Sequence, residues 1–406
     1  MMKLSGIFYL VILLCIATTG MVAGQDRMVQ SDKITLIEYS EYEKTKERIE
    51  HNDPKAKSNY NRLIEKAESA IKHKGFSVVK KTGVPPSGDK HDYMTIGPYW
   101  WPNPSTSDGL PYIRRDGEIN PETRNDFTDY VEWQNFVRSL TILRDAFYFS
   151  ENDVYAKKAL VLIKTWFLDQ ETKMNPNLDY SQSIPGKTDG RKFGIIEFAN
   201  IVEVVKCLEL LGERNQLDPA TQLSIKAWLS EYARWLQYSE NGKGEAHTKN
   251  NHATYYDLQL LSILTYLGKT EEVKKYLSTI TISRIYDQIE PDGSQPLELA
   301  RTKSFSYSVM NLHGFLSLAR LGKKVGVDLW DAQTSDGRSI KKGFEYMLSY
   351  FTEEKAWEYE QIADAEGSRQ KLIEDIKYAS QLFEEDDFNS ALQLIEKGEA
   401  NITFRK

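Results

Sequence analysis

The stretch that decides the fold is IVEVVKCLELLGERNQLDPATQLSIKAWLSEYARWL, residues 201–236. Each half of it places apolar side chains three or four residues apart; the positions are Ile201, Val204, Val205, Leu208 and Leu211, then Trp228, Leu229, Tyr232, Trp235 and Leu236. This spacing gathers the apolar residues on one face of a helix with 3.6 residues per turn. The stretch therefore predicts two amphipathic helices joined by a short connection.

The same periodicity recurs along the chain, whereas the alternating pattern of strands is scarce. Further helix faces are predicted at Phe136, Leu140, Leu143 and Phe147; at Ala156, Leu160, Ile163 and Phe167; at Leu260, Leu261, Leu264 and Leu267; and at Val309, Leu312, Leu316 and Leu321. Three predicted helices end in leucine followed by Gly212, Gly268 or Gly322, spaced 56 and 54 residues apart, and glycine favours the left-handed position after a helix. A repeat of this length holds two helices with their connections. We expect an all-α fold, an (α/α) toroid or incomplete barrel of helical hairpins, with an open solenoid as the alternative.

The two ends of the chain differ from this repeat. Residues 1–24 resemble a signal peptide, with Lys3 before an apolar run and small residues before Gln25. We therefore expect an exported protein, periplasmic or secreted, without membrane insertion. Residues 25–340 are predicted to form the toroid, and residues 341–406 a helical C-terminal extension that packs on it.

Residues 93–125 interrupt the helical pattern with five prolines and several aromatic side chains. Proline is excluded from the interior of a regular helix, and long ordered loops inside a compact domain are usually functional. We expect this segment to contribute to a binding site.

Composition excludes several classes of function. The 406 residues include 52 basic and 59 acidic side chains, a net charge of −7, which disfavours a general nucleic-acid binder. Two cysteines cannot form a disulfide scaffold. The six histidines form no HxH or HExxH motif, and no CxxC occurs, so we expect neither a metal ion nor another cofactor in the reaction.

Polar residues suited to catalysis or to substrate binding occur in three clusters. They are Asn250-Asn251-His252, Glu298-Leu299-Ala300-Arg301 with Tyr307, and Gly190-Arg191. His252 lies 15 residues, and Tyr307 14 residues, before the leucine that closes its predicted helix. On parallel helices both side chains then lie at one level, roughly 21–23 Å from the helix ends. Arg191 and Arg301 each lie 20 residues before such a leucine. We therefore expect the clusters to share one site.

Each residue alone also has an ordinary structural explanation. Asn250 can cap a helix, Arg301 can pair with Glu298 on the same helix face, and His252 or Tyr307 can simply pack. Together, an amide, an imidazole, a guanidinium and a phenol suit proton abstraction next to a carboxylate. The amide and guanidinium stabilise the developing dianion, while tyrosine or histidine moves the protons. This chemistry is the β-elimination of a uronic-acid polysaccharide.

Several motifs carry a resemblance to a known family; they are YWWPNP at 99–104, DGLPYIRRDG at 108–117, GIIEF at 194–198, Asn250-Asn251-His252, and Glu298-Leu299 followed by Arg301 and Tyr307. They resemble the signature of the alginate-lyase superfamily, over about residues 80–330. The resemblance implies an (α/α) toroid that cleaves mannuronate- or guluronate-containing polymers without metal. It also implies that Asn251 and Arg301 neutralise the substrate carboxylate, while His252 and Tyr307 transfer protons.

Alginate is the expected substrate and β-1,4-glucuronan the second choice, acted on by a monomeric enzyme. The residues expected to bind the polymer are Tyr99, Trp100, Trp101, Arg114, Arg115, Gln134, Gln182, Arg191, Glu197, Asn250 and Glu298. Aromatic rings would stack on sugars, and the arginines would give an acidic protein a locally positive groove. Because a free tyrosine titrates near pH ~10, Tyr307 as a base needs a cation that favours its phenolate, and Arg301 is the candidate.

Two other classes of protein share these features. An inverting glycoside hydrolase needs two opposed carboxylates, for which Glu197 and Glu298 are the candidates, with Asp189 in reserve. A glycan-binding protein of an uptake system needs the aromatic residues but no proton-transfer groups. A lyase produces unsaturated sugar ends that absorb ultraviolet light, a hydrolase produces reducing ends without them, and a binding protein produces neither.

Overall fold

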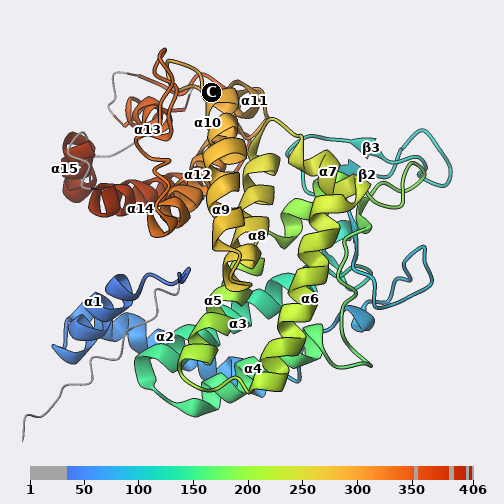
Figure 1. The fold of residues 1–406 in the computed structure, drawn as a ribbon. Coiled ribbons are helices and arrows are strands. Elements are labelled where there is room, and N and C mark those ends of the chain that lie inside the picture. The colour runs from blue at the N-terminus through green and yellow to red at the C-terminus, as the bar shows by residue number, and fades with distance from the viewer. Residues whose placement is uncertain (1–33, 352–354, 384–387, 399–401, 405–406) are drawn as a thin grey trace, which may run out of the picture. The chain divides into compact units, whose positions relative to one another are not determined.

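A computed structural model describes residues 34–351, 355–383, 388–398 and 402–404. The predicted all-α character is confirmed, because helices make up most of these residues (Figure 1). The α-helices are α1 (Tyr39–Glu50), α2 (Pro54–Lys72), α3 (Tyr130–Ser150), α4 (Asp153–Phe167), α5 (Ile201–Glu213), α6 (Pro219–Tyr238), α7 (Glu240–Ala246), α8 (Asn251–Tyr266), α9 (Thr270–Tyr276), α10 (Ile282–Gln288), α11 (Pro296–Leu299), α12 (Ser304–Val325), α13 (Ile340–Leu348), α14 (Ala365–Phe383) and α15 (Asn389–Lys397).

The stretch 201–236 forms α5 and α6, as its periodicity predicts. The side chain of Asp218 accepts a hydrogen bond from the backbone N of Thr221 at 2.9 Å, and Pro219 occupies the first helical position of α6. Both features favour a helix start, because the cap satisfies a free N–H and proline has none to satisfy. The predicted faces of the two helices are buried, except for Trp235, which is half-buried.

Four helices form a continuous row at the centre of the fold: α3 packs against α5, α5 against α8, and α8 against α12. The connecting helices α4, α6 and α9 each pack against a member of this row. Nearly every residue of α8 is buried, as expected for a helix covered on all sides. The row of hairpins is the predicted incomplete toroid (Figure 1).

Residues 34–38, which we call the N-terminal strap, connect α5 to α12. The Oγ1 of Thr35 and the backbone N of Leu36 both donate to Glu209 of α5 at 2.9 Å. Glu38 forms ion pairs with Arg320 at 3.2 Å and with Lys324 at 2.6 Å, both on α12. The strap thereby links two helices of the row that are separated by α8.

Two of the three predicted glycine helix ends are wrong. Gly268 does follow α8 with a φ of +77°, but Gly212 and Gly322 lie inside α5 and α12. A Cβ on Gly322 would lie 2.4 Å from the carbonyl oxygen of Val327, so this glycine permits the chain after α12 to fold back closely. The left-handed residue that ends α12 is Gly326, with a φ of +79°.

The proline-rich segment is ordered and carries short strands that the sequence did not predict. They are β1 (Met94–Ile96), β2 (Trp100–Trp101) and β3 (Ile113–Arg114), followed by the 3₁₀ turn η2 (Pro121–Arg124). β2 and β3 pair antiparallel, and β1 pairs in parallel with β4 (Tyr180–Ser183). Strands of two to four residues are too short to show an alternating pattern of polar and apolar side chains, so they could not be predicted from the sequence.

After residue 340 the chain is again helical, with α14 packed against α12. Nδ1 of His313 on α12 lies 2.9 Å from an Asp375 carboxylate oxygen on α14. The predicted signal peptide, residues 1–24, lies outside the described residues. Among the helices of residues 34–404 that the structure describes, none combines the length and apolarity of a membrane span.

Candidate active site

A cavity of about 670 Å³, here called the catalytic cavity, lies between the proline-rich segment and the N-terminal ends of α8 and α12. Most residues singled out from the sequence line it; they are Tyr99, Trp100, Arg114, Gln134, Gln182, Arg191, Glu197, Asn250, Asn251, His252, Arg301 and Tyr307. His252 is the second residue of α8 and Tyr307 the fourth of α12. The two side chains lie at the same end of the helix row because both helices begin at this cavity. This common position was predicted from the sequence by counting back from the C-terminal ends of the helices instead.

Arg301 is held by a carboxylate from the proline-rich segment. Its Nε and Nη2 donate to the two oxygens of Asp116 at 3.1 and 2.9 Å, a forked geometry that fixes the guanidinium plane. Nη2 also donates to the hydroxyl of Tyr307 at 3.0 Å, and the guanidinium lies over the Tyr307 ring, 4.0 Å from its centroid. Asp116 therefore directs the positive charge of Arg301 onto Tyr307.

The ion pair leaves both partners charged. Although burial raises the pKa of Asp116, Arg301 lowers it more strongly and Arg114 adds to this, which brings the value to about 2. Burial lowers the pKa of Arg301, but the hydrogen bond and charge of Asp116 outweigh this effect and raise it. The pair is thus a permanent dipole behind the Tyr307 hydroxyl.

The pKa of Tyr307 differs from the expectation drawn from Arg301 alone. Burial raises it, Tyr99 raises it further, and Arg301 lowers it by less than these two together. The hydroxyl groups of Tyr99 and Tyr307 lie 2.5 Å apart, which places Tyr99 beside the reacting group as well as in the expected sugar-binding wall. Tyr307 is therefore a phenol in the free protein.

His252 has a buried carboxylate behind it. Its Nδ1 lies 2.6 Å from Oε1 of Glu245, the side chain of which is fully buried. A carboxylate at Nδ1 holds the ring proton there and leaves Nε2 without one, free to accept a proton. The Phe193 ring packs edge-on against the imidazole at 5.0 Å. Sequence reasoning missed Glu245, although it lies only seven residues before His252.

Asn251 is fixed by Glu298, which does not line the cavity. The backbone N and the Nδ2 of Asn251 donate to the two carboxylate oxygens of Glu298, each at 2.7 Å. Glu298 thereby satisfies a free N–H at the start of α8 and places negative charge near the positive end of the helix. An amide nitrogen has two N–H groups, so Asn251 retains one for a ligand.

Arg191 lies on the wall formed by β4 and the turn η3 (Lys192–Phe198). Its Nε and Nη2 donate to the main-chain and side-chain oxygens of Gln182 at 3.0 and 2.7 Å. Gln182 has a φ of +46°, a conformation that costs energy for a residue with a side chain and is common at functional sites. A Cβ on Gly97 would lie 2.6 Å from Cδ1 of Trp100 and 2.9 Å from Nη2 of Arg191, so a side chain there would displace these two residues. Burial lowers the pKa of Arg191 to about 10, which leaves it charged at neutral pH.

Three predicted substrate-binding residues lie outside the cavity lining. The Nε1 of Trp101 donates to the carbonyl of Glu118 at 3.1 Å, and the guanidinium of Arg115 lies over the Trp101 ring at 4.8 Å. These contacts occupy both side chains within the proline-rich segment. Glu298 is not available to the substrate because both of its carboxylate oxygens accept hydrogen bonds from Asn251.

The opposed carboxylate pair of an inverting hydrolase is not assembled. Glu197 lines the cavity and its Oε2 accepts a hydrogen bond from Thr95 at 2.7 Å, but Glu298 lies behind Asn251. Asp189 is exposed and does not line the cavity. Burial raises the pKa of Glu197, although its hydrogen bond with Thr95 opposes this effect.

Arginine is the dominant charged residue of this lining. Among the described residues that form it, the arginines are Arg114, Arg124, Arg191 and Arg301, and the single carboxylate is Glu197. Further lining residues that sequence reasoning missed are Arg124, Tyr130, Phe193, Ile196, Asn200, Tyr255 and Met310. No cluster of three or more His, Cys, Asp or Glu side chains with the geometry of a metal site occurs within the described residues.

Comparison with known proteins identifies the family. The family model described as alginate lyase matches residues 77–357. A crystal structure of an alginate lyase from Bacteroides ovatus is 36% identical to this chain, covers 88% of it and 93% of its own length, and superposes with a TM-score of 0.83. Alginate lyase A1-III from Sphingomonas species A1 is 16% identical over 72% of this chain and 75% of its own, with a TM-score of 0.46. No protein of curated function matches the sequence. The chain belongs to the alginate lyase family and is a polysaccharide lyase.

Proposed function

We propose that this lyase cleaves alginate by β-elimination without a metal ion, with His252 as the base and Tyr307 as the acid. One observation carries the proposal: an acidic chain of net charge −7 lines its catalytic cavity with four arginines and one carboxylate. A local positive potential of this kind attracts a polyanion. The Bacteroides ovatus alginate lyase, which resembles this chain at 36% identity, supports alginate over other uronate polymers. Glucuronan remains the second candidate.

His252 is the group suited to remove the proton at C5. Glu245 directs the proton-free Nε2 towards the cavity that His252 lines and stabilises the imidazolium that forms. Two donors accompany this base: Asn251 precedes it in the sequence, and Arg191 contacts the same Phe193 ring. They are placed to neutralise the carboxylate at C5, on which negative charge develops as the proton leaves.

Tyr307 is the group suited to protonate the leaving oxygen. Its raised pKa keeps it in the acid form. When the electron pair from the C5–H bond forms the C4–C5 double bond, the bond from C4 to the glycosidic oxygen breaks, and the Tyr307 proton goes to that oxygen. The phenolate left behind is stabilised by Nη2 of Arg301, which lies 3.0 Å from the Tyr307 oxygen.

This scheme changes the role that the family resemblance implies for Arg301. Three of its N–H contacts go to Asp116 and Tyr307, so its charge acts on the acid rather than on the substrate carboxylate. Metal independence is proposed on the same ground, because arginine and amide donors supply the charge stabilisation that a Lewis acid would otherwise provide.

The experiment is a substrate panel of polymannuronate, polyguluronate, glucuronan and a neutral glycan, followed by ultraviolet absorbance and by a reducing-end assay. We expect absorbance and reducing ends to rise together on at least one alginate block, with equal rates after treatment with a chelator. Reducing ends without absorbance would indicate hydrolysis and contradict the proposal. Activity on glucuronan alone would replace alginate by the second candidate.

Export is proposed from residues 1–24 alone, and a monomeric enzyme is proposed with it. We expect the protein recovered from the periplasm or medium of its host to begin near Gln25 by mass spectrometry. A product that retains Met1 in the cytoplasm would contradict export. Light scattering of the purified enzyme tests the monomer.

A further inference from the structure

A second cavity, here called the inner cavity, lies between α5, α8 and α12 and has a volume of about 390 Å³. It shares Ala199, Asn200 and Tyr255 with the lining of the catalytic cavity. Leu36 and Glu38 of the N-terminal strap also line it. Its volume falls within the range of small-molecule sites, and the proposed elimination makes no use of it.

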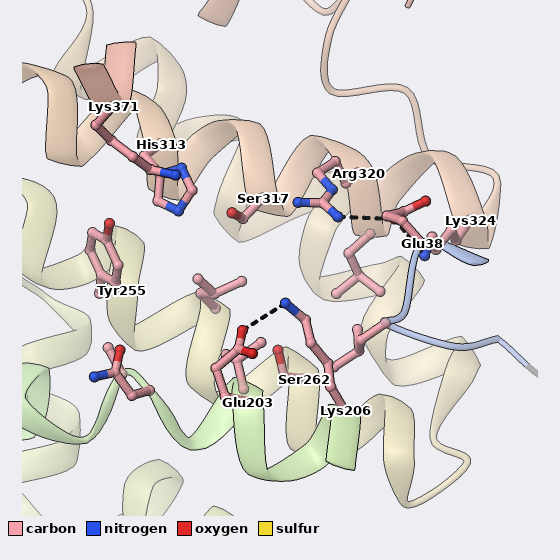
Figure 2. A pocket seen from close by; sticks show the side chains of 16 residues that line it. Glu38, Glu203, Lys206, Tyr255, Ser262, His313, Ser317, Arg320, Lys324 and Lys371 are labelled. Carbon is pink, nitrogen blue, oxygen red and sulfur yellow. Dashed lines mark hydrogen bonds and ion pairs between the residues drawn. The ribbon is translucent and has the colours of Figure 1, made fainter. Parts of the chain in front are cut away.

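The inner cavity is bordered by a polar stripe on α12. His313, Ser317, Arg320 and Lys324 are spaced by four, three and four residues, so they lie on one helix face and extend for about 16 Å. Figure 2 shows this row across the cavity from Lys206, which projects from α5. A helix face that is turned towards the interior is normally apolar. Part of this stripe holds neighbouring segments, because His313 pairs with Asp375 on α14 and both Arg320 and Lys324 pair with Glu38 of the N-terminal strap.

Cations outnumber carboxylates in this lining. Among the described residues that form it, the cations are Lys206, Arg320, Lys324 and Lys371, and the carboxylates are Glu38 and Glu203. Lys206 pairs with Glu203 at 2.7 Å, and Arg320 with Glu38 at 3.2 Å. Lysine has three N–H donors and arginine five, so one carboxylate does not exhaust either side chain. The lining suits a ligand that carries both an acidic group and hydroxyl groups.

Ser262 on α8 provides an independent sign of a ligand. Its side chain is fully buried, and Oγ has no hydrogen-bond partner within the described part of the chain. It lines the inner cavity on the α8 side (Figure 2). Buried polar atoms in native proteins are almost always hydrogen-bonded, so this hydroxyl is placed for a polar ligand in the cavity.

We propose that the inner cavity binds a uronate unit of an oligosaccharide whose remaining units occupy the catalytic cavity. The inference rests on the proposed function for the nature of the saccharide. The uronate carboxylate would pair with Lys206 and Arg320, while its hydroxyl groups would contact Glu203, Ser262 and Ser317. Asn200 and Tyr255 line both cavities, so the proposal requires the saccharide to pass beside these two side chains.

The test measures calorimetric binding of an alginate hexasaccharide to a Tyr307→Phe enzyme, which keeps the ligand intact. In this background, Lys206→Gln removes a cation and Ser317→Phe fills the cavity. The matched control is Lys274→Gln, since Lys274 pairs with a glutamate three residues earlier on the surface of α9, as Lys206 does on α5. We expect each cavity variant to weaken binding about tenfold, Lys206→Arg to restore it, and the control to bind like the parent.

Unchanged affinity in Lys206→Gln and Ser317→Phe would overturn the inference, as would an equal loss in Lys274→Gln. If Ser317→Phe does not unfold cooperatively on heating, the affinities of Lys206→Gln and Lys206→Arg alone decide whether the inner cavity binds the saccharide. The proposed function is read separately, from unsaturated ends formed by the wild-type enzyme. An enzyme that cleaves alginate normally while the cavity variants bind normally would lose this inference and keep its proposed function.

Discussion

The catalytic cavity and the inner cavity are both lined by cations, but they hold these cations differently. In the catalytic cavity, Asp116 holds Arg301 and Glu245 holds His252, and neither carboxylate lines the cavity. In the inner cavity, the carboxylates belong to the lining itself, as with Glu203 beside Lys206. Every such carboxylate offsets part of the charge of its partner, but one that lies behind a side chain also orients that side chain towards the substrate. The first arrangement suits catalysis and the second suits binding.

The largest effect is expected from Tyr307→Phe, which removes the proton donor of the catalytic cavity. We expect kcat on alginate to fall by roughly 10²- to 10⁴-fold, with the affinity for an oligosaccharide nearly unchanged. Tyr112→Phe is the control, since Tyr112 belongs to the same proline-rich segment and does not line the cavity. Absorbance kinetics and calorimetry measure both quantities. A Tyr307→Phe enzyme with the kcat of wild type would remove Tyr307 from the reaction.

Glu245→Gln tests whether the carboxylate behind His252 contributes to the rate of the reaction. We expect kcat to fall about 10- to 100-fold with KM unchanged, because the amide no longer stabilises the imidazolium of His252. The same change in a His252→Ala background should add nothing, since residues that act as a unit are not additive. Equal losses in both backgrounds would show that Glu245 acts on the structure of the cavity and not through His252.

The helical fold was largely predictable because local periodicity encodes it, and many cavity-facing residues were predictable from polar clusters and from motifs shared with a known family. The apolar faces of α5 and α8 follow directly from spacing, whereas the common level of His252 and Tyr307 was inferred by counting back from two glycine helix ends, of which only Gly268 is one. Helix ends were less predictable, since Gly322 serves a close approach of chain that only the tertiary structure reveals.

The residues behind the reacting groups were not predictable to the same degree. Asp116 contacts Arg301 across 185 positions of sequence, and no local pattern encodes such a contact. The pKa of Tyr307 could not be foreseen either, because burial outweighs the neighbouring cation. Trp101 and Arg115 fit the sequence pattern of a sugar site, yet they bind each other within the loop.

Asp116→Asn should affect both rate and stability, but less than the loss of Tyr307. We expect kcat to fall about tenfold and the free energy of unfolding to fall by about 1–3 kcal/mol, as for other hydrogen bonds to charged groups. The pKa of Asp116 is lowered to about 2 in the folded protein. Its contribution is therefore complete above the ordinary carboxyl pKa of about 4 and is lost as the pH falls through about 2.

Denaturant unfolding of wild type and Asp116→Asn between pH 7 and pH 2 measures this contribution. The two stabilities should converge at the acid end. A difference that stays constant over the whole range would show that the carboxylate charge of Asp116 does not stabilise the protein.

The smallest effect is expected from Glu209→Gln, which changes a buried carboxylate that no catalytic group uses. Glu209 anchors the N-terminal strap through Thr35 and Leu36 at 2.9 Å, and burial raises its pKa in the folded protein although these hydrogen bonds oppose the effect. For an acid with a raised pKa, folding disfavours the charged form, so the wild type loses stability as the pH rises above the ordinary glutamate value of about 4.3. The isosteric amide keeps an acceptor for the strap and removes this loss. We therefore expect kcat to be unchanged and the unfolding free energy at pH 7 to lie within about 1 kcal/mol of wild type, with the variant gaining relative to wild type between pH 4 and pH 7. Denaturant unfolding of variant and wild type at both pH values checks the sign of this difference in unfolding free energy. A variant that instead loses several kcal/mol at pH 7 would show that the charge of Glu209 stabilises the strap, as the charge of Asp116 stabilises the catalytic cavity.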